Sequence, residues 1–294
     1  MTRPAAVLAL GGAQFGLDYG ISNRRGRIPF GEVESILARA VEAGVRTIDT
    51  APAYGDSEDV VGRIVGDDPR WRVITKTADL SGPEPAARRL SVGLARSLER
   101  LRRPGIDTLL FHRAADLDRD DAGELLEAAE DLKRTGLTRR LGVSVYESTD
   151  LDAVLRRGSW DVVQLPLSII DQRLIRSGHL ARLAGAGIEV HVRSTFLQGL
   201  LLGPPEDLPG FAVPFASALS RVHERSRDLG ISPLELCLAF VRRLPEVSVC
   251  LIGLSGLGDL EQALAARLPE LPDLADLAID RPDLVDPRRW PHRG

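Results

Sequence analysis

The chain has little of several residue types. Among 294 residues it has two cysteines, Cys237 and Cys250, three tyrosines and an aromatic content of only 4%. Two cysteines in apolar surroundings exclude a disulfide framework and indicate buried free thiols in a reducing compartment. Every apolar run is shorter than the ~20 residues that a membrane helix needs. We therefore expect neither a disulfide-stapled fold nor a membrane protein.

Excess charge of either sign is also lacking, since the net charge is only −4 at pH 7. This balance argues against a nucleic-acid partner and against binding to an acidic membrane surface. The first residues lead directly into a short apolar strand and lack the longer apolar stretch of a signal peptide. We therefore expect a cytoplasmic protein. The sequence does not indicate an oligomeric state.

Lysine is scarce. Of the 38 Lys and Arg residues, only Lys76 and Lys133 are lysines. Lys76 stands at the end of an apolar run, in a chain that uses arginine almost everywhere else. A site that needs a compact ammonium with an adjustable pKa excludes the planar and permanently charged guanidinium. Lys76 is therefore a candidate functional residue.

Strand-like and helix-like segments alternate along the whole chain. Helical patterns cover Gly31–Ala43, Glu84–Leu101, Ala122–Thr135, Phe215–Leu229 and Asp259–Arg267. Eight strands that alternate with helices predict a parallel sheet, and the count of eight favours a closed barrel. The expected strands are Val7–Leu10, Val45–Asp49, Arg72–Lys76, Asp107–His112, Arg140–Ser144, Val162–Leu165, Ile188–Val192 and Val249–Ile252.

This pattern predicts an α/β fold, a (β/α)8 TIM barrel with its active site at the C-terminal ends of the strands. The absence of a G-x-G-x-x-G motif after the first strand argues against a doubly wound dinucleotide-binding sheet. No linker divides the chain, so we expect one domain over residues 1–294, with residues 269–294 as a C-terminal tail or flap. Ser232-Pro233 followed by Glu235 predicts a capped helix start.

Polar residues end several of the predicted strands and should meet at one mouth of the barrel. Asp49, Lys76 and His112 end three of the first four strands, and Tyr54 follows Asp49 closely. A tyrosine hydroxyl has an ordinary pKa near 10, and a neighbouring ammonium lowers it. A carboxylate can hold that ammonium, and a histidine can orient a carbonyl. This set suits proton transfer to a carbonyl oxygen while a cofactor delivers hydride to carbon.

The set resembles the Asp-Tyr-Lys-His tetrad of the aldo-keto reductases. The similarity covers nearly the whole chain, and it implies that Tyr54 is the general acid, that Lys76 and Asp49 adjust its acidity, and that His112 places the carbonyl. The matching segments are Leu10–Gly16, Thr47–Gly55, Ile74–Thr77, Leu110–His112, Leu141–Ser144, Val163–Gln164, Ser194 to Leu201 and Ile252–Ser255.

The resemblance also implies a nicotinamide cofactor and no metal. Ser144 and Gln164 would bind the nicotinamide carboxamide, and Arg193 would replace the aromatic residue that commonly stacks on the ring. The full set of expected cofactor contacts is Gly12, Ser144, Gln164, Arg193, Ser194, Phe196, Gly199, Leu200, Gly253, Ser255 and Asp259.

The identity of the cofactor stays open between NADPH and NADH. Members that prefer NADPH place a cation just after the position of Ser255, but this chain has Ser255-Gly256-Leu257-Gly258-Asp259 there. Asp259 would repel a 2′-phosphate, and an acidic residue near the ribose selects NADH. The family as a whole slightly favours NADPH.

We expect a small-molecule carbonyl substrate, and arginines in the first loop suggest a polar, sugar-like or anionic one. An alternative is a barrel that binds the cofactor and docks on a partner as a regulatory subunit, with weak or no turnover. An isomerase or lyase that uses a tightly held cofactor is a third reading. A metal hydrolase fits poorly, because the five histidines are scattered. The expected substrate-lining residues are Phe15, Tyr19, Asn23, Arg24, Arg25, Tyr54, Leu80 and Arg193.

Overall fold

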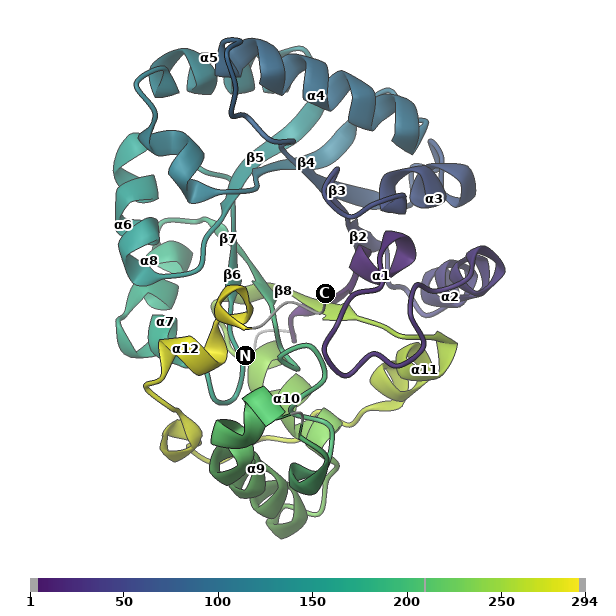
Figure 1. Cartoon of the computed structure of the whole chain (residues 1–294), viewed down its shortest axis with the longest axis vertical. Helices are drawn as coiled ribbons and strands as arrows, with labels where there is room; N and C mark the ends of the chain where they lie inside the picture. Colours follow the sequence, from purple (N-terminus) through teal and green to yellow (C-terminus); the bar gives the residue numbers. More distant parts are fainter. Residues whose placement is uncertain (1–4, 209, 291–294) are drawn as a thin grey trace.

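Eight parallel strands close into a barrel in chain order, and β8 pairs with β1 to complete the ring (Figure 1). The structure is a computed structural model and describes residues 5–208 and 210–290. The barrel confirms the (β/α)8 fold predicted from the alternating pattern. Its strands are β1 (Val7–Gly11), β2 (Thr47–Asp49), β3 (Arg72–Lys76), β4 (Ile106–Phe111), β5 (Thr138–Ser144), β6 (Val162–Pro166), β7 (Glu189–Arg193) and β8 (Val247–Gly253).

The helices lie around the outside of the barrel (Figure 1). In the described residues, none is long and apolar enough to cross a membrane. The α-helices are α1 (Ala13–Gly16), α2 (Phe30–Glu42), α3 (Ser57–Ile64), α4 (Ala86–Leu101), α5 (Ala122–Arg134), α6 (Ser148–Arg157), α7 (Arg173–Arg176), α8 (His179–Gly185), α9 (Ala216–Asp228), α10 (Pro233–Arg242), α11 (Leu257–Ala265) and α12 (Pro282–Val285).

The element boundaries differ from those expected by at most two residues. The strand expected from Val45 begins at Thr47, because the Val45 N–H instead donates to the Ala40 carbonyl and belongs to the end of α2. At the start of α10, the Ser232 hydroxyl accepts from the Glu235 N–H at 3.2 Å, and the Glu235 carboxylate accepts from the Ser232 N–H at 2.8 Å. This reciprocal pair confirms the predicted helix cap.

The main hydrophobic core fills the layer between the strands and the outer helices. One side of each strand packs against this layer, as with Leu8, Leu109 and Val163. Smaller apolar clusters separate from this layer include Ile74, Leu110 and Val162, which come from strands β3, β4 and β6. The strands are thus held by apolar packing, which leaves their C-terminal ends free to carry polar side chains.

A network of charged side chains links the N-terminal ends of the strands. Arg72 of β3 contacts Asp107 of β4 at 3.5 Å and Glu189 of β7 at 3.3 Å. Arg140 of β5 pairs with both carboxylates. Because β3 and β7 are not neighbours in the sheet, these pairs cross the barrel. The network therefore links the strands at one end of the barrel, the end opposite to their C-terminal ends.

The described part of the C-terminal region, residues 269–290, packs against the loops of the second half of the barrel (Figure 1, yellow). The Ile279 N–H donates to the Ile170 carbonyl at 3.0 Å. The Trp290 ring lies 5.7 Å from the Phe211 ring and 5.8 Å from the Phe215 ring, between centroids. The last residues of the predicted tail, 291–294, lie outside the described residues.

Candidate active site

Lys76 is buried at the end of β3, among the polar residues that the sequence placed at the barrel mouth. Its Nζ donates to Asp49 Oδ1 at 2.5 Å and to the Thr50 carbonyl at 3.0 Å. Burial is the largest single influence and opposes the charged ammonium, but Asp49 and Tyr54 together outweigh burial and raise the pKa of Lys76 above its usual value. Lys76 is therefore a charged ammonium at neutral pH.

Asp49 ends β2 and has both carboxylate oxygens engaged. Oδ1 accepts from Lys76, and Oδ2 accepts from the Gln164 side-chain amide at 2.8 Å. Asp49 is thus a buried carboxylate that holds the Lys76 ammonium through one oxygen and the Gln164 amide through the other.

Tyr54 lies beside this pair on the loop after β2. The Lys76 Nζ is 4.8 Å from the centroid of the Tyr54 ring, and the Tyr54 and His112 rings meet edge to face with centroids 6.0 Å apart. Burial raises the pKa of Tyr54 above 10, and the Lys76 charge lowers it only in part. Lys76 thus lowers the pKa of Tyr54 as expected, but burial raises that pKa by more. Tyr54 therefore carries its proton at neutral pH.

His112 follows β4 and meets the Tyr54 ring edge to face. Burial, reinforced by the positive charge of Lys76, lowers the pKa of His112 to about 4. The imidazole is therefore neutral at neutral pH and has one N–H to donate and one nitrogen to accept. An uncharged donor beside a protonated tyrosine is suited to binding a carbonyl oxygen.

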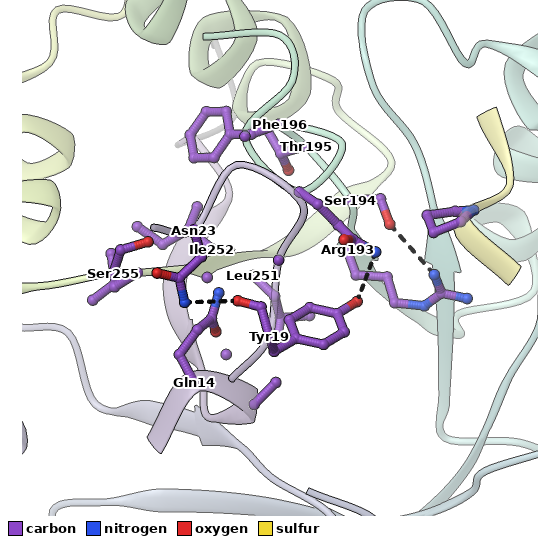
Figure 2. A pocket seen from close by; sticks show the side chains of 18 of the residues that line it. Gln14, Tyr19, Asn23, Arg193, Ser194, Thr195, Phe196, Leu251, Ile252 and Ser255 are labelled. Carbon is purple, nitrogen blue, oxygen red and sulfur yellow. Dashed lines mark hydrogen bonds between the residues drawn. The ribbon is translucent and has the colours of Figure 1, made fainter. Parts of the chain in front are cut away.

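These four residues line a cavity of about 520 Å³ that extends from Tyr54 to Gln262 of α11. Figure 2 shows its walls, with Gln14 on one side, Arg193 on another and the Tyr19 ring between them. The predicted residues that line it, besides these four, are Tyr19, Asn23, Ser144, Gln164, Arg193, Ser194, Phe196, Gly199, Gly253, Ser255 and Asp259.

Several residues expected at the cavity lie elsewhere. Phe15 and Leu80 are fully buried in the main core and do not line the cavity. Leu200 packs in the second apolar cluster. Arg24 is exposed and does not line the cavity. Arg25 does not line it either, since its guanidinium binds Glu32 and the Ser255 carbonyl.

Gly12 also lies outside the cavity wall, and its role is one of close packing. Its N–H donates to the Asp49 carbonyl at 2.7 Å. A Cβ at this position would lie 2.9 Å from Ser57 Oγ and 3.0 Å from the Asp49 carbonyl oxygen. Glycine therefore lets the loop after β1 approach the strand end that carries Asp49.

The loop after β7 has an unusual backbone. Ser194, Leu197 and Gln198 have positive φ angles of 65°, 45° and 54°, and Gly199 follows at 88°. Gln198 binds the first loop, since its Oε1 accepts from the Ile21 N–H at 3.0 Å and its backbone carbonyl accepts from the Ser22 hydroxyl at 2.6 Å. Strained segments held by such contacts occur at functional sites.

Five of the lining residues were not expected from the sequence, namely Gln14, Ser22, Tyr146, Gln262 and Pro287. Thr195 and Gln198 also line the cavity, and they belong to the run from Ser194 to Leu200 that the resemblance places along the cofactor. No sequence pattern indicated Tyr146 or Pro287, since they reach the cavity only through the packing of the C-terminal region against the loop after β5.

The lining fits a nicotinamide cofactor at its catalytic end. Ser144 and Gln164 are paired in register where β5 and β6 end, so their side chains stand together at the mouth. The Gln164 amide nitrogen is engaged with Asp49, which leaves its carbonyl oxygen as an acceptor for a carboxamide. In the described residues, no group of three His, Cys, Asp or Glu side chains could hold a metal ion.

At the other end of the cavity, acidic side chains cover the start of α11. The Ser255 N–H donates to Asp259 at 2.6 Å, and the Leu257 N–H donates to Glu32 at 3.1 Å. A Cβ at Gly256 would lie only 2.0 Å from Arg25 Nη1. Two backbone donors at this helix end, the N–H groups of Ser255 and Leu257, therefore already bind carboxylates.

Comparison with known proteins agrees with this arrangement. The chain is 26% identical over 254 residues to the uncharacterized oxidoreductase YqkF of Bacillus subtilis, which covers 79% of this chain and 81% of that protein. It is 35% identical over 135 residues to an aldo-keto reductase of Mycolicibacterium vanbaalenii, a match that spans only 46% of that protein.

Solved structures share the fold. The holo form of an aldo-keto reductase from Bacillus halodurans superposes with a TM-score of 0.75 at 20% identity, covering 98% of this chain and 99% of that one. A glycerol dehydrogenase from Gluconobacter oxydans gives a TM-score of 0.72 at 23% identity, covering 94% of this chain and 92% of that one. The model of the aldo/keto reductase family matches residues 7–277, and the chain belongs to this family.

Proposed function

We propose that the protein is an NAD(P)H-dependent oxidoreductase that reduces the carbonyl group of an aldehyde or ketone, or oxidises the corresponding alcohol. The observation that carries the proposal is the buried Lys76–Asp49 ion pair beside a protonated Tyr54 at the end of a cavity. A bound nicotinamide supplies the hydride.

Tyr54 is the proton donor in this reaction. Its hydroxyl gives a proton to the carbonyl oxygen as negative charge develops there, and the charge moves to the tyrosine oxygen. The Lys76 ammonium, which lies against the Tyr54 ring, stabilises that phenolate. Asp49 keeps the ammonium in position through its 2.5 Å contact.

His112 binds and orients the substrate. Because it is neutral, its N–H can donate to the carbonyl oxygen without competing with Tyr54 as an acid. Gln164 serves two groups at once, with its amide nitrogen on Asp49 and its oxygen toward the cavity. The same residues act in the oxidation of an alcohol, which is the reverse of this reaction.

The test is a fluorescence titration with NADPH and NADH, followed by turnover on a panel of aldehydes and ketones. Saturable binding with net consumption of reduced cofactor is the expected result. Binding without turnover of any carbonyl would support a regulatory barrel instead. Conversion of substrate without net change of the cofactor would support an isomerase. Binding of neither cofactor would overturn the proposal.

A further inference from the structure

Arg193, at the end of β7, is a cation of the cavity wall that has no acidic partner. Its guanidinium donates to the Val145 carbonyl at 3.1 Å and reaches Ser194 Oγ at 3.4 Å, and in the described part of the chain it forms no ion pair. Many of the other arginines pair with a carboxylate, as Arg72, Arg140 and Arg288 do. An unpaired cation facing a cavity is a ready site for an anion.

The Arg193 guanidinium is held in a fixed orientation. It stacks on the Tyr146 ring with its central carbon 3.8 Å from the ring centroid. The same ring carries Arg288 at 3.6 Å, and Arg288 is held by the buried Asp286 at 2.6 Å. The C-terminal region therefore supports Tyr146, and Tyr146 supports Arg193 from behind. A group that is already immobilised loses little entropy when a ligand binds it.

Most of the hydrogen-bonding capacity of Arg193 remains unused. A guanidinium has five N–H groups. The contacts to Val145 and Ser194 use two of them, so three remain among the contacts of the described residues. The planar fork of such donors matches the two oxygens of a carboxylate.

The charge balance of the cavity also favours an anionic ligand. Its charged lining residues are Lys76, Asp49, Arg193 and Asp259. Lys76 and Asp49 neutralise each other as an ion pair, and Asp259 lies at the far end, where it binds the Ser255 N–H. The catalytic end therefore has a net positive charge from Arg193.

Arg193 also faces the catalytic residues. Its positive charge contributes to the lowered pKa of His112, after burial and Lys76, and partly offsets the raised pKa of Tyr54. In Figure 2 the Arg193 side chain extends along the cavity wall opposite Gln14, with the Tyr19 ring between them. A molecule bound to Tyr54 and His112 would thus have Arg193 within its electrostatic reach.

We propose that Arg193 is the anion-binding group of the substrate site and that the substrate is an aldehyde or ketone that carries a carboxylate. The carbonyl binds at Tyr54 and His112, and the carboxylate binds the open edge of the Arg193 guanidinium. This inference rests on the proposed function and names its substrate class. It moves anion recognition from Arg24 and Arg25 of the first loop to a residue of β7. It also assigns Arg193 to the substrate in place of the nicotinamide stacking that the resemblance implies.

The kinetic test compares two substrates that differ in charge, 4-formylbenzoate and its methyl ester. In Arg193→Gln, kcat/KM for 4-formylbenzoate is expected to fall by about 10- to 100-fold, and that for the ester by less than about threefold. Arg193→Lys keeps the charge without the planar fork and should restore part of the preference. Arg27→Gln, an exposed arginine outside the cavity, is the matched control for net charge. Equal losses for both substrates would overturn the proposal.

A binding test separates this inference from the proposed function. Calorimetric titration with benzoate, which has no reducible carbonyl, against neutral benzamide tests the subsite even if no carbonyl is turned over. Benzoate should bind the wild-type protein more tightly than benzamide does, and Arg193→Gln should remove the difference. Unchanged benzoate binding in Arg193→Gln, or none in the wild type, would overturn the subsite.

Titrating the Arg193→Gln variant with NADPH and NADH tests whether Arg193 binds the phosphates of the cofactor, which are the other source of an anion. Unchanged cofactor affinity together with lost benzoate binding supports a substrate subsite. A loss confined to cofactor affinity would assign Arg193 to the cofactor instead, and the proposal would fail. Thermal unfolding of each variant checks that the fold is intact.

Discussion

The Gln164 side-chain amide donates to Asp49 Oδ2 at 2.8 Å, across the mouth of the barrel and over a separation of 115 residues. Because Lys76 donates to the other carboxylate oxygen, each oxygen of Asp49 accepts a side-chain hydrogen bond. Gln164 therefore links the carboxylate that holds the Lys76 ammonium to the wall proposed to bind the nicotinamide.

Gln164→Leu is expected to lower the free energy of unfolding by about 2 kcal/mol, since it removes a buried hydrogen bond to a charged group. It should also weaken NADH and NADPH binding by similar factors, because both contain the carboxamide that Gln164 is proposed to bind. Urea unfolding and fluorescence titration measure the two effects. A variant that loses stability but binds both cofactors normally would restrict Gln164 to supporting Asp49.

Tyr54→Phe tests the proton donor. It removes the hydroxyl and keeps the ring that lies against Lys76 and His112. Turnover should fall by about 10²- to 10⁴-fold, the usual contribution of a general acid, while the cofactor dissociation constant changes by less than about twofold. Steady-state kinetics and titration of the same sample provide the check. Undiminished turnover would show that another group donates the proton.

The pH profile of carbonyl reduction follows from the protonation states at the site. Because the pKa of His112 is lowered to about 4 and the pKa of Tyr54 is raised above 10, neither group titrates near neutrality. The rate should be flat from about pH 5.5 to 9 and should decline only as Tyr54 loses its proton at higher pH. A step near pH 6.5 that disappears in His112→Gln would contradict the neutral histidine.

The barrel-bottom network, formed by Arg72, Asp107, Arg140 and Glu189, predicts an acid-dependent loss of stability. Burial opposes ionisation of Glu189, but its bond to His191 and the charges of Arg140 and Arg72 outweigh burial and lower its pKa from 4.5 to about 2. Since the folded state has the lower pKa, the stabilisation is complete above pH 4.5 and is lost as the pH falls toward 2.

Glu189→Gln should therefore lower the free energy of unfolding by about 3 kcal/mol at pH 7. The difference from the wild type should shrink as the pH is lowered below 4.5. Urea unfolding of both proteins at a series of pH values measures it. A difference that stays constant down to pH 3 would mean that the network does not act through the charge of Glu189. The network lies opposite the active site, so cofactor binding serves as the internal control.

Asp259 is expected to disfavour a cofactor that carries a 2′-phosphate. Its carboxylate occupies the Ser255 N–H, and Glu32 occupies the Leu257 N–H at the same helix end. Asp259→Asn should raise the affinity for NADPH relative to NADH by about fivefold, through removal of one like charge. The ratio of the two dissociation constants reports this directly. An unchanged ratio would place the adenosine ribose away from α11.

The sequence by itself determined the fold and the positions of the candidate catalytic residues. Alternating strand and helix patterns predicted the barrel, and the polar residues at the ends of Ile48-Asp49 and Ile74-Thr75-Lys76 could be located because parallel strands share one carboxyl edge. The capped start at Ser232 was predicted for a local reason, since a cap depends on residues only three positions apart.

Only the tertiary structure decided which side chains reach the cavity. Phe15, Leu80 and Leu200 are close in sequence to residues that line the cavity, yet they are buried in apolar clusters, because the direction of a side chain after a strand end depends on the elements that pack on it. Tyr146 and Pro287 became lining residues through contacts between segments more than a hundred residues apart. The pKa of Tyr54 was also decided there, since burial is a property of the assembled site and not of the neighbouring lysine.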